Sequence, residues 1–227
     1  MTARAEFLLR HLGPALAIAA VLLALDATPL DSAISNWFFD PVAGAFPLRH
    51  HTALEVLGHQ WAKQLAVVVA CGTIALYLLS FVLPALRPFG QLLLFLSLAL
   101  TLAPLAVTLL KITSARYCPW DLQKYGGFAP HLALFAAAPR GLQPGHCFPG
   151  GHASGGFALC AFYFAGLSLG NRRLALTGLW GALAAGMVFG MVRIVQGAHF
   201  LSHNLWSALV CWLVILALYV AVMGLPK

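Results

Sequence analysis

The sequence contains few charged residues. Only 8% of its 227 residues are charged, and just six of them are acidic. A water-soluble globular protein carries roughly 25% charged residues, so the composition excludes that class. Intrinsic disorder is excluded as well, because 61% of the residues are hydrophobic and a solvated chain cannot expose so much apolar surface. The composition therefore indicates an integral membrane protein.

Long apolar runs separated by short polar breaks follow one another along the chain. They are typical of transmembrane helices, which need about 20 predominantly apolar residues. The predicted fold class is all-α: one integral membrane domain over residues 1–227, built as a bundle of six transmembrane helices. We expect the spans at 12–28, 65–83, 90–110, 152–169, 174–192 and 204–223.

The distribution of basic residues predicts the orientation of these spans. With six spans, both termini and the turns at Arg87 and Arg172 lie on one side, which carries six bases and one acid. The other side carries seven bases and five acids. By the positive-inside rule, the termini are cytoplasmic and segments 29–64, 111–151 and 193–203 face the outer compartment. The short first span also has the shape of a cleavable signal peptide, whose removal would leave this orientation unchanged.

Three clusters of ionisable residues lie at the ends of the expected spans, all on the outer side. They run from Lys111 to Trp120, from Cys147 to Ser154 and from Arg193 to Asn204. Ionisable residues at membrane depth are costly, which makes them functional candidates. Anchoring at the interface explains one such cluster but explains three on one face poorly. We therefore expect an active site at the outer ends of the third to sixth helices.

The residue types in these clusters suit phosphoryl transfer. The glycine pair 150–151 precedes a helix, and the first N–H groups of a helix can bind an oxyanion. Lys111 and Arg193 add positive charge to the same oxyanion. His152 and His199 can supply a nucleophile, which forms a phosphohistidine, and a general acid. No metal or other cofactor is required, because these cationic groups and N–H donors stabilise the developing charge.

Two further sets of residues leave alternatives open. His199 and His203 are four residues apart, so on a helix they could bind zinc, with His152 as a third ligand. Cys118 and Cys147 both lie in the outer segment 111–151. An oxidising compartment would let them form a disulfide that staples this segment, and otherwise they are two free thiols.

Taken together, the three clusters resemble the motifs of the type-2 phosphatidic acid phosphatase superfamily, which are integral membrane lipid phosphatases with six helices. The family pattern is Lys-x6-Arg-Pro, then Pro-Ser-Gly-His, then Ser-Arg-x5-His-x3-Asp. The matching residues here are Lys111, Pro119, Pro149, Gly151, His152, Arg193 and His199. The resemblance covers residues from about 65 to 210. It implies that His199 is the nucleophile, that His152 is the general acid, and that Lys111 and Arg193 bind phosphate.

The first and third motifs depart from the family pattern. Cys118 stands where the family has its first arginine. Arg116, two residues earlier, or Arg140 could supply the missing charge. Val192 replaces the serine that precedes the arginine of the third motif. The sequence looks like a divergent bacterial subgroup, which implies an inner-membrane protein with a periplasmic site.

Two more departures concern hydrogen bonds in the site. Gly150 stands where the family has serine, so one phosphate hydrogen bond is lost or comes from Ser154. His203 occupies the position of the aspartate that orients the nucleophilic histidine. A carboxylate there fixes the tautomer and stabilises the imidazolium. Asp121, or an acid from segment 29–64, could take that role.

The sequence therefore predicts a lipid phosphatase that works through a phosphohistidine at the periplasmic face. The candidate substrates are polyprenyl diphosphate, lipid A phosphate and phosphatidylglycerol phosphate. Its expected partners are this phosphorylated lipid and the bilayer, and not nucleic acid. Two alternatives stay open: a lipid-to-lipid phosphotransferase, and a lipid-binding protein without turnover, which the departures from the family motifs suggest.

Overall fold

The structure is a computed structural model that describes residues 2–225, apart from the side chains of residues 57–59 and 62–63. Within that range the chain forms helices and two isolated β-bridges, with no strand, which confirms the all-α class. The α-helices are α1 (Ala3–Leu25), α2 (Leu30–Asn36), α3 (Thr52–Glu55), α4 (Ala62–Leu79), α5 (Gly90–Thr113), α6 (Gly151–Phe157), α7 (Ala161–Ser168), α8 (Arg172–Val195) and α9 (Leu201–Met223). The other helical elements are the π-helix η1 (Val56–Trp61) and the 3-10 helices η2 (Arg87–Phe89), η3 (Pro119–Asp121), η4 (Gln123–Tyr125) and η5 (Ala158–Cys160).

In the described part of the chain, four helical segments are long and apolar enough to cross a membrane. They are Ala3–Leu25, Arg87–Thr113, Arg172–Val195 and Leu201–Met223. The two other predicted spans are helical but do not meet that criterion of length and composition. Residues 65–83 fall on α4, whose apolar part Gln64–Leu79 is shorter. Residues 152–169 fall on α6 and α7, which the single 3-10 turn η5 separates.

The first helix begins earlier than the predicted start at residue 12. Thr2 caps α1, because its hydroxyl oxygen accepts a hydrogen bond from the backbone N–H of Ala5 at 3.3 Å. Glu6 and Arg10 then form an exposed ion pair at 3.4 Å, one helical turn apart. Polar residues thus continue the helix beyond its apolar run, which hydropathy alone does not detect.

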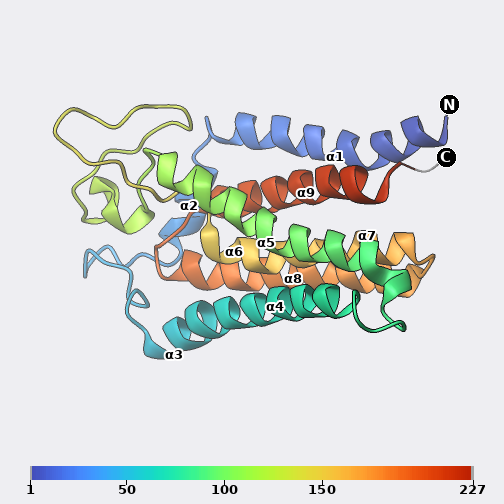
Figure 1. The fold of residues 1–227 in the computed structure, drawn as a ribbon. Helices are drawn as coiled ribbons and strands as arrows, with labels where there is room; N and C mark the ends of the chain where they lie inside the picture. Colours follow the sequence, from blue (N-terminus) through green and yellow to red (C-terminus); the bar gives the residue numbers. More distant parts are fainter. Residues whose placement is uncertain (1, 226–227) are drawn as a thin grey trace.

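The long helices pack side by side around one apolar core (Figure 1). Helix α5 packs along α9, while α6 and α7 pack against α8, and α1 lies against α9. Phe95, Phe157, Phe164 and Ile215 are among the fully buried side chains of this core. Helices α6 and α8 meet at glycines, since a β-carbon on Gly156 would lie only 2.4 Å from the backbone nitrogen of Gly186. This close approach holds the short helix α6 against the middle of α8.

The long connecting segments, 26–51 and 114–150, gather at one end of the bundle (Figure 1). The first turn of α1 and the last turn of α9 lie together at the opposite end (Figure 1). Phe46, Tyr117, Tyr125 and Phe200 belong to a second apolar cluster, which joins segments 37–51, 114–130 and the α8–α9 connection. Helix α2 is attached to the bundle as well, because Asp31 accepts hydrogen bonds from the backbone N–H of Ser202, at 2.9 Å, and from its hydroxyl. These connecting segments therefore form a packed cap over the ends of α5, α6, α8 and α9.

Candidate active site

The three sequence clusters meet beneath this cap. Lys111 lies in the last turn of α5, His152 in the first turn of α6, Arg193 in the last turn of α8, and His199 in the connection to α9. The ring centroids of His152 and His199 are 6.4 Å apart. The Lys111 side chain is 3.9 Å from where a β-carbon on Gly151 would lie. Residues up to 88 positions apart in the sequence thus converge on one site.

Backbone hydrogen bonds hold the three clusters together. The N–H of Trp120 donates to the carbonyl of Gly197 at 2.9 Å, which connects the first cluster to the third. The N–H of Gly150 donates to the carbonyl of His203 at 2.9 Å, which connects the second to the third. Gly197 adopts a φ of 73°, a left-handed conformation that favours glycine, and this turn lets the chain reverse between α8 and α9. Main-chain hydrogen bonds therefore fix the three clusters relative to one another.

His199 is 2% exposed, and one of its two ring nitrogens already has close neighbours. Its Nδ1 lies 3.4 Å from Nδ1 of His203 and 3.5 Å from Sγ of Cys147. An Nδ1–H that donates to His203 leaves Nε2 with the free lone pair. Burial lowers the pKa of His199 well below its usual range, and the charges of His203, Lys111, His152 and Arg193 lower it further. The imidazole is therefore neutral at neutral pH, as a nucleophile must be.

Arg193 is held by a residue that sequence reasoning missed. Its Nη1 donates to Oε1 of Gln196 at 2.7 Å, and its guanidinium lies 5.6 Å from the centroid of the Trp120 ring. Gln196 is completely buried. A neutral amide partner positions the guanidinium without neutralising it, so the charge stays available to an anion. The only sequence signal was the place of Gln196 inside the third cluster.

Cys118 and Cys147 form a disulfide that joins the first cluster to the second. Cys147, His199 and His203 bring three possible metal-ligand atoms, one sulfur and two ring nitrogens, within 4.8 Å of one another. In the disulfide this sulfur is not a thiolate, which is the form that binds metals. His152, which the zinc alternative named as a third ligand, is not part of this group.

The structure gives Arg116 a partner other than phosphate. Its Nη1 is 2.8 Å from Oδ1 of Asp26, and the arginine is 3% exposed. A buried guanidinium already paired with a carboxylate has little charge left for a second anion. Arg140, the other candidate, is exposed in the outer loop. Arg116 is therefore engaged by Asp26, and it is not part of the proposed phosphate site.

The other expected supporting residues are also engaged elsewhere. The Ser154 hydroxyl donates to the carbonyl of Gly151 at 2.6 Å. Burial raises the pKa of Asp121, while a hydrogen bond from Trp120 and the charge of Arg49 act in the opposite direction. Asp31, from segment 29–64, caps α9 instead. Within the described residues, neither acid forms a hydrogen bond with His199, and its Nδ1 faces His203 and the Cys147 sulfur instead.

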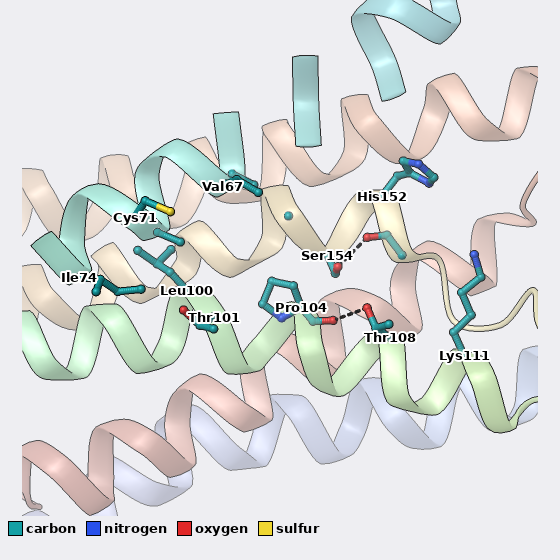
Figure 2. A pocket seen from close by; sticks show the side chains of 14 residues that line it. Val67, Cys71, Ile74, Leu100, Thr101, Pro104, Thr108, Lys111, His152 and Ser154 are labelled. Atoms are coloured by element: carbon teal, nitrogen blue, oxygen red, sulfur yellow. Dashed lines mark hydrogen bonds between the residues drawn. The ribbon is translucent and has the colours of Figure 1, made fainter. Parts of the chain in front are cut away.

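An open groove leads away from the site along α4, α5 and α6. It has a volume of about 550 Å³, and Lys111, Gly151 and His152 line one end of it. Figure 2 shows Lys111 and His152 at that end, and Ile74 and Leu100 towards the other. The remaining wall is made mainly of small and apolar side chains from α4 and α5. One end of the groove is therefore cationic and contains a histidine, and the rest of the groove is mainly apolar.

No curated protein and no solved structure matches the chain. The PAP2 superfamily matches residues 92–226. This match spans most of α5 and all of α6 to α9, with Lys111, His152, Arg193 and His199 inside it. More than half of the sequence is covered, and the chain belongs to the PAP2 superfamily, the type-2 phosphatidic acid phosphatases.

Proposed function

We propose that this membrane protein is a lipid phosphatase. Membership of the PAP2 superfamily implies phosphatase activity on phosphorylated substrates. The observation that supports a lipid substrate is the groove, whose cationic end holds Lys111 and His152 and whose other end is apolar. A phosphate headgroup fits the first end, and burial of an attached hydrocarbon chain along α4 and α5 is favourable. The substrate enters sideways from the bilayer.

The proposed orientation places the site on the periplasmic side of a bacterial inner membrane. In this arrangement α4 and the α6–α7 pair complete six crossings with the four long helices. The start of α1 and the end of α9 lie at the end of the bundle away from the long connecting segments (Figure 1). Arg4, Arg10, Arg172 and Arg173 lie near or at that opposite end of the helices. Cytoplasmic basic residues and an outward-facing site agree with the positive-inside rule.

In the first step, the Nε2 lone pair of His199 attacks phosphorus. A P–N bond forms while the bond between phosphorus and the lipid oxygen breaks, and His152 gives its proton to that oxygen. The products are a phosphohistidine and a lipid alcohol, or a lipid monophosphate when the substrate is a diphosphate. Lys111 and Arg193 stabilise the negative charge on the phosphoryl oxygens, so the step needs no metal.

In the second step, water attacks the phosphohistidine. His152, now neutral, takes a proton from the water while the P–N bond breaks and inorganic phosphate leaves. His203 keeps the nucleophile in one tautomer throughout, because its Nδ1 lies 3.4 Å from Nδ1 of His199. The phosphotransferase alternative differs only in the acceptor, since a lipid hydroxyl would replace water.

A block in the groove tests the lipid assignment. Cys71 lines the groove on α4, and Cys71→Trp would fill it at a distance from His152. We expect this variant to lose at least tenfold in kcat/KM for polyprenyl diphosphate, lipid A and phosphatidylglycerol phosphate in mixed micelles, and to hydrolyse p-nitrophenyl phosphate normally. Val68→Trp is the matched control, because Val68 is 66% exposed on the same helix and does not line the groove.

Three results would contradict parts of this proposal. Equal losses in the two tryptophan variants would show that the groove does not hold the lipid chain. Phosphate release from none of the substrates by the wild-type protein would reject the phosphatase assignment. Radiolabel that moves from one lipid to another, and not into inorganic phosphate, would identify the transferase.

A further inference from the structure

Asn204 is buried in the first turn of α9 between two glycines. It is 1% exposed. A β-carbon on Gly150 would lie 2.4 Å from its Oδ1, and one on Gly190 would lie 2.7 Å from its Nδ2. Any larger residue at either position would collide with the carboxamide. The two glycines on α8 and before α6 therefore make the space that the Asn204 side chain fills.

The carboxamide of Asn204 has no hydrogen-bond partner among the described residues, at either Nδ2 or Oδ1. Buried polar groups in folded proteins are almost always hydrogen-bonded, and one that is not calls for an explanation. Two donors at the end of α8 share this property, Nε of Arg193 in its last turn and Nε2 of Gln196 directly after it. Three buried donors without protein acceptors thus lie near the end of α8 and the start of α9.

Position 150 lacks a side chain that could donate to phosphate, and its neighbours do not compensate. The Gly150 N–H already donates to His203, and its carbonyl accepts from Ser207. The Ser154 hydroxyl is directed to the carbonyl of Gly151. Asn204 is the polar side chain that occupies the volume where a side chain on residue 150 would begin.

We propose that Asn204 is a phosphate-binding residue, whose amide NH2 donates to a phosphoryl oxygen from the space left by Gly150. This inference rests on the proposed function of the site. A half-turn of the carboxamide exchanges Nδ2 and Oδ1, so the donor can face either glycine. Gly150 and Asn204 then form a matched pair, in which one residue gives up its side chain and the other supplies the hydrogen bond.

Binding of inorganic phosphate to the detergent-purified protein tests this role by calorimetry. Asn204→Leu keeps the branched shape and removes both polar atoms, and we expect phosphate affinity to fall roughly 10- to 100-fold, as for loss of a hydrogen bond to a charged group. Asn204→Asp keeps the shape more closely and adds a negative charge, so its loss should be larger. The melting temperature of Asn204→Leu should not fall, because an unpaired polar group is removed. Asn36→Leu, which removes the acceptor of a hydrogen bond from Tyr125 in the outer cap, is the control with unchanged affinity.

A compensating pair separates binding from packing. Gly150→Ser alone should lower both affinity and melting temperature, because its β-carbon collides with Asn204. Asn204→Ala alone should lower affinity. Gly150→Ser combined with Asn204→Ala supplies a hydroxyl and the room for it, so this double variant should bind phosphate more tightly than either single variant.

The outcomes distinguish the role of Asn204 from the proposed phosphatase function. Unchanged phosphate affinity in both Asn204→Leu and Asn204→Asp would overturn the role of Asn204, as would a wild-type protein that binds no phosphate. A double variant that regains melting temperature but not affinity would also overturn it, since Asn204 would then only fill space. A wild-type protein that binds phosphate through Asn204 but releases none from lipids would support this site and reject the proposed function.

Discussion

Arg116 and Asp26 form a buried ion pair that ties the end of α1 to the chain that follows α5. Their Nη1 and Oδ1 atoms are 2.8 Å apart, with the two side chains 4% and 15% exposed. Oδ2 of the same carboxylate accepts a hydrogen bond from the backbone N–H of Leu134 at 3.0 Å. The pair therefore fixes segment 114–150 to the first helix.

This pair predicts a loss of stability and not of phosphate affinity. Asp26→Ala leaves Arg116 buried without a counter-charge, which costs about 3 kcal/mol or more of unfolding free energy. Arg116→Met leaves Asp26, which is less deeply buried and still accepts the hydrogen bond from Leu134, so it should cost less. We expect thermal melts to show this order, with KM changed less than twofold in both variants. A large rise in KM for Arg116→Met at an unchanged melting temperature would instead identify Arg116 as a phosphate ligand.

The two histidines should respond differently to the leaving group. His199→Ala removes the nucleophile and should lower kcat at least about 1,000-fold for every substrate. His152→Ala removes the proton donor, so its loss of about 100- to 10,000-fold should be largest for lipid substrates. With p-nitrophenyl phosphate, whose leaving group departs without a proton, formation of the phosphohistidine should be nearly normal. Steady-state rates measure the loss in His199→Ala, and the rate at which acid-labile radiolabel appears on the protein measures the first step in His152→Ala. A His152→Ala variant that becomes labelled as slowly from p-nitrophenyl phosphate as from a lipid would contradict these roles.

The sequence predicted the members of this site better than their partners. Lys111, His152, Arg193 and His199 were found because each follows or precedes an apolar run, and because the ends of membrane helices on one side of a bilayer lie close together. The pairing of Arg116 with Asp26 was not predicted, since the two residues are 90 positions apart and any nearby acid would fit the sequence equally well.

Departures from the family motifs were the hardest part to interpret. A glycine at position 150 suggested a lost hydrogen bond, and only the structure shows that Asn204 fills the space beside it. Shape complementarity between distant residues leaves no periodic signal in a sequence. The number of spans is the other part that the sequence did not settle. The apolar part of α4 is shorter than the four long helices, and the 3-10 turn η5, which hydropathy does not register, separates α6 from α7.

The disulfide should contribute more to stability than to catalysis. Cys118 and Cys147 are 29 positions apart, and a link that closes a loop of this size is worth about 3.5 kcal/mol by the chain-entropy estimate. Cys118→Ser should therefore lower the melting temperature under non-reducing conditions, while the KM of the remaining folded protein stays close to the wild-type value. A thiol-modification assay with and without reductant verifies the bond. A raised KM with an unchanged melting temperature would show that the disulfide shapes the phosphate site instead.

The pH dependence of kcat/KM should report the unusual surroundings of His199. Its pKa is lowered by burial first, and then by the charges of His203, Lys111, His152 and Arg193. Protonation destroys the nucleophile, so a lowered pKa keeps the enzyme active as the pH falls below about 6.5, where an ordinary histidine becomes charged.

His203→Asp should shift the pH dependence of kcat/KM in a direction that can be measured. A carboxylate beside Nδ1 stabilises the imidazolium and raises the pKa of His199, so the acid limb of kcat/KM should move to higher pH by about 1 unit or more. The substrate's own phosphate ionisation affects wild type and variant equally, and the difference between the two profiles removes it. Superimposable acid limbs would mean that residue 203 does not face the nucleophile during turnover, and that another group fixes its tautomer.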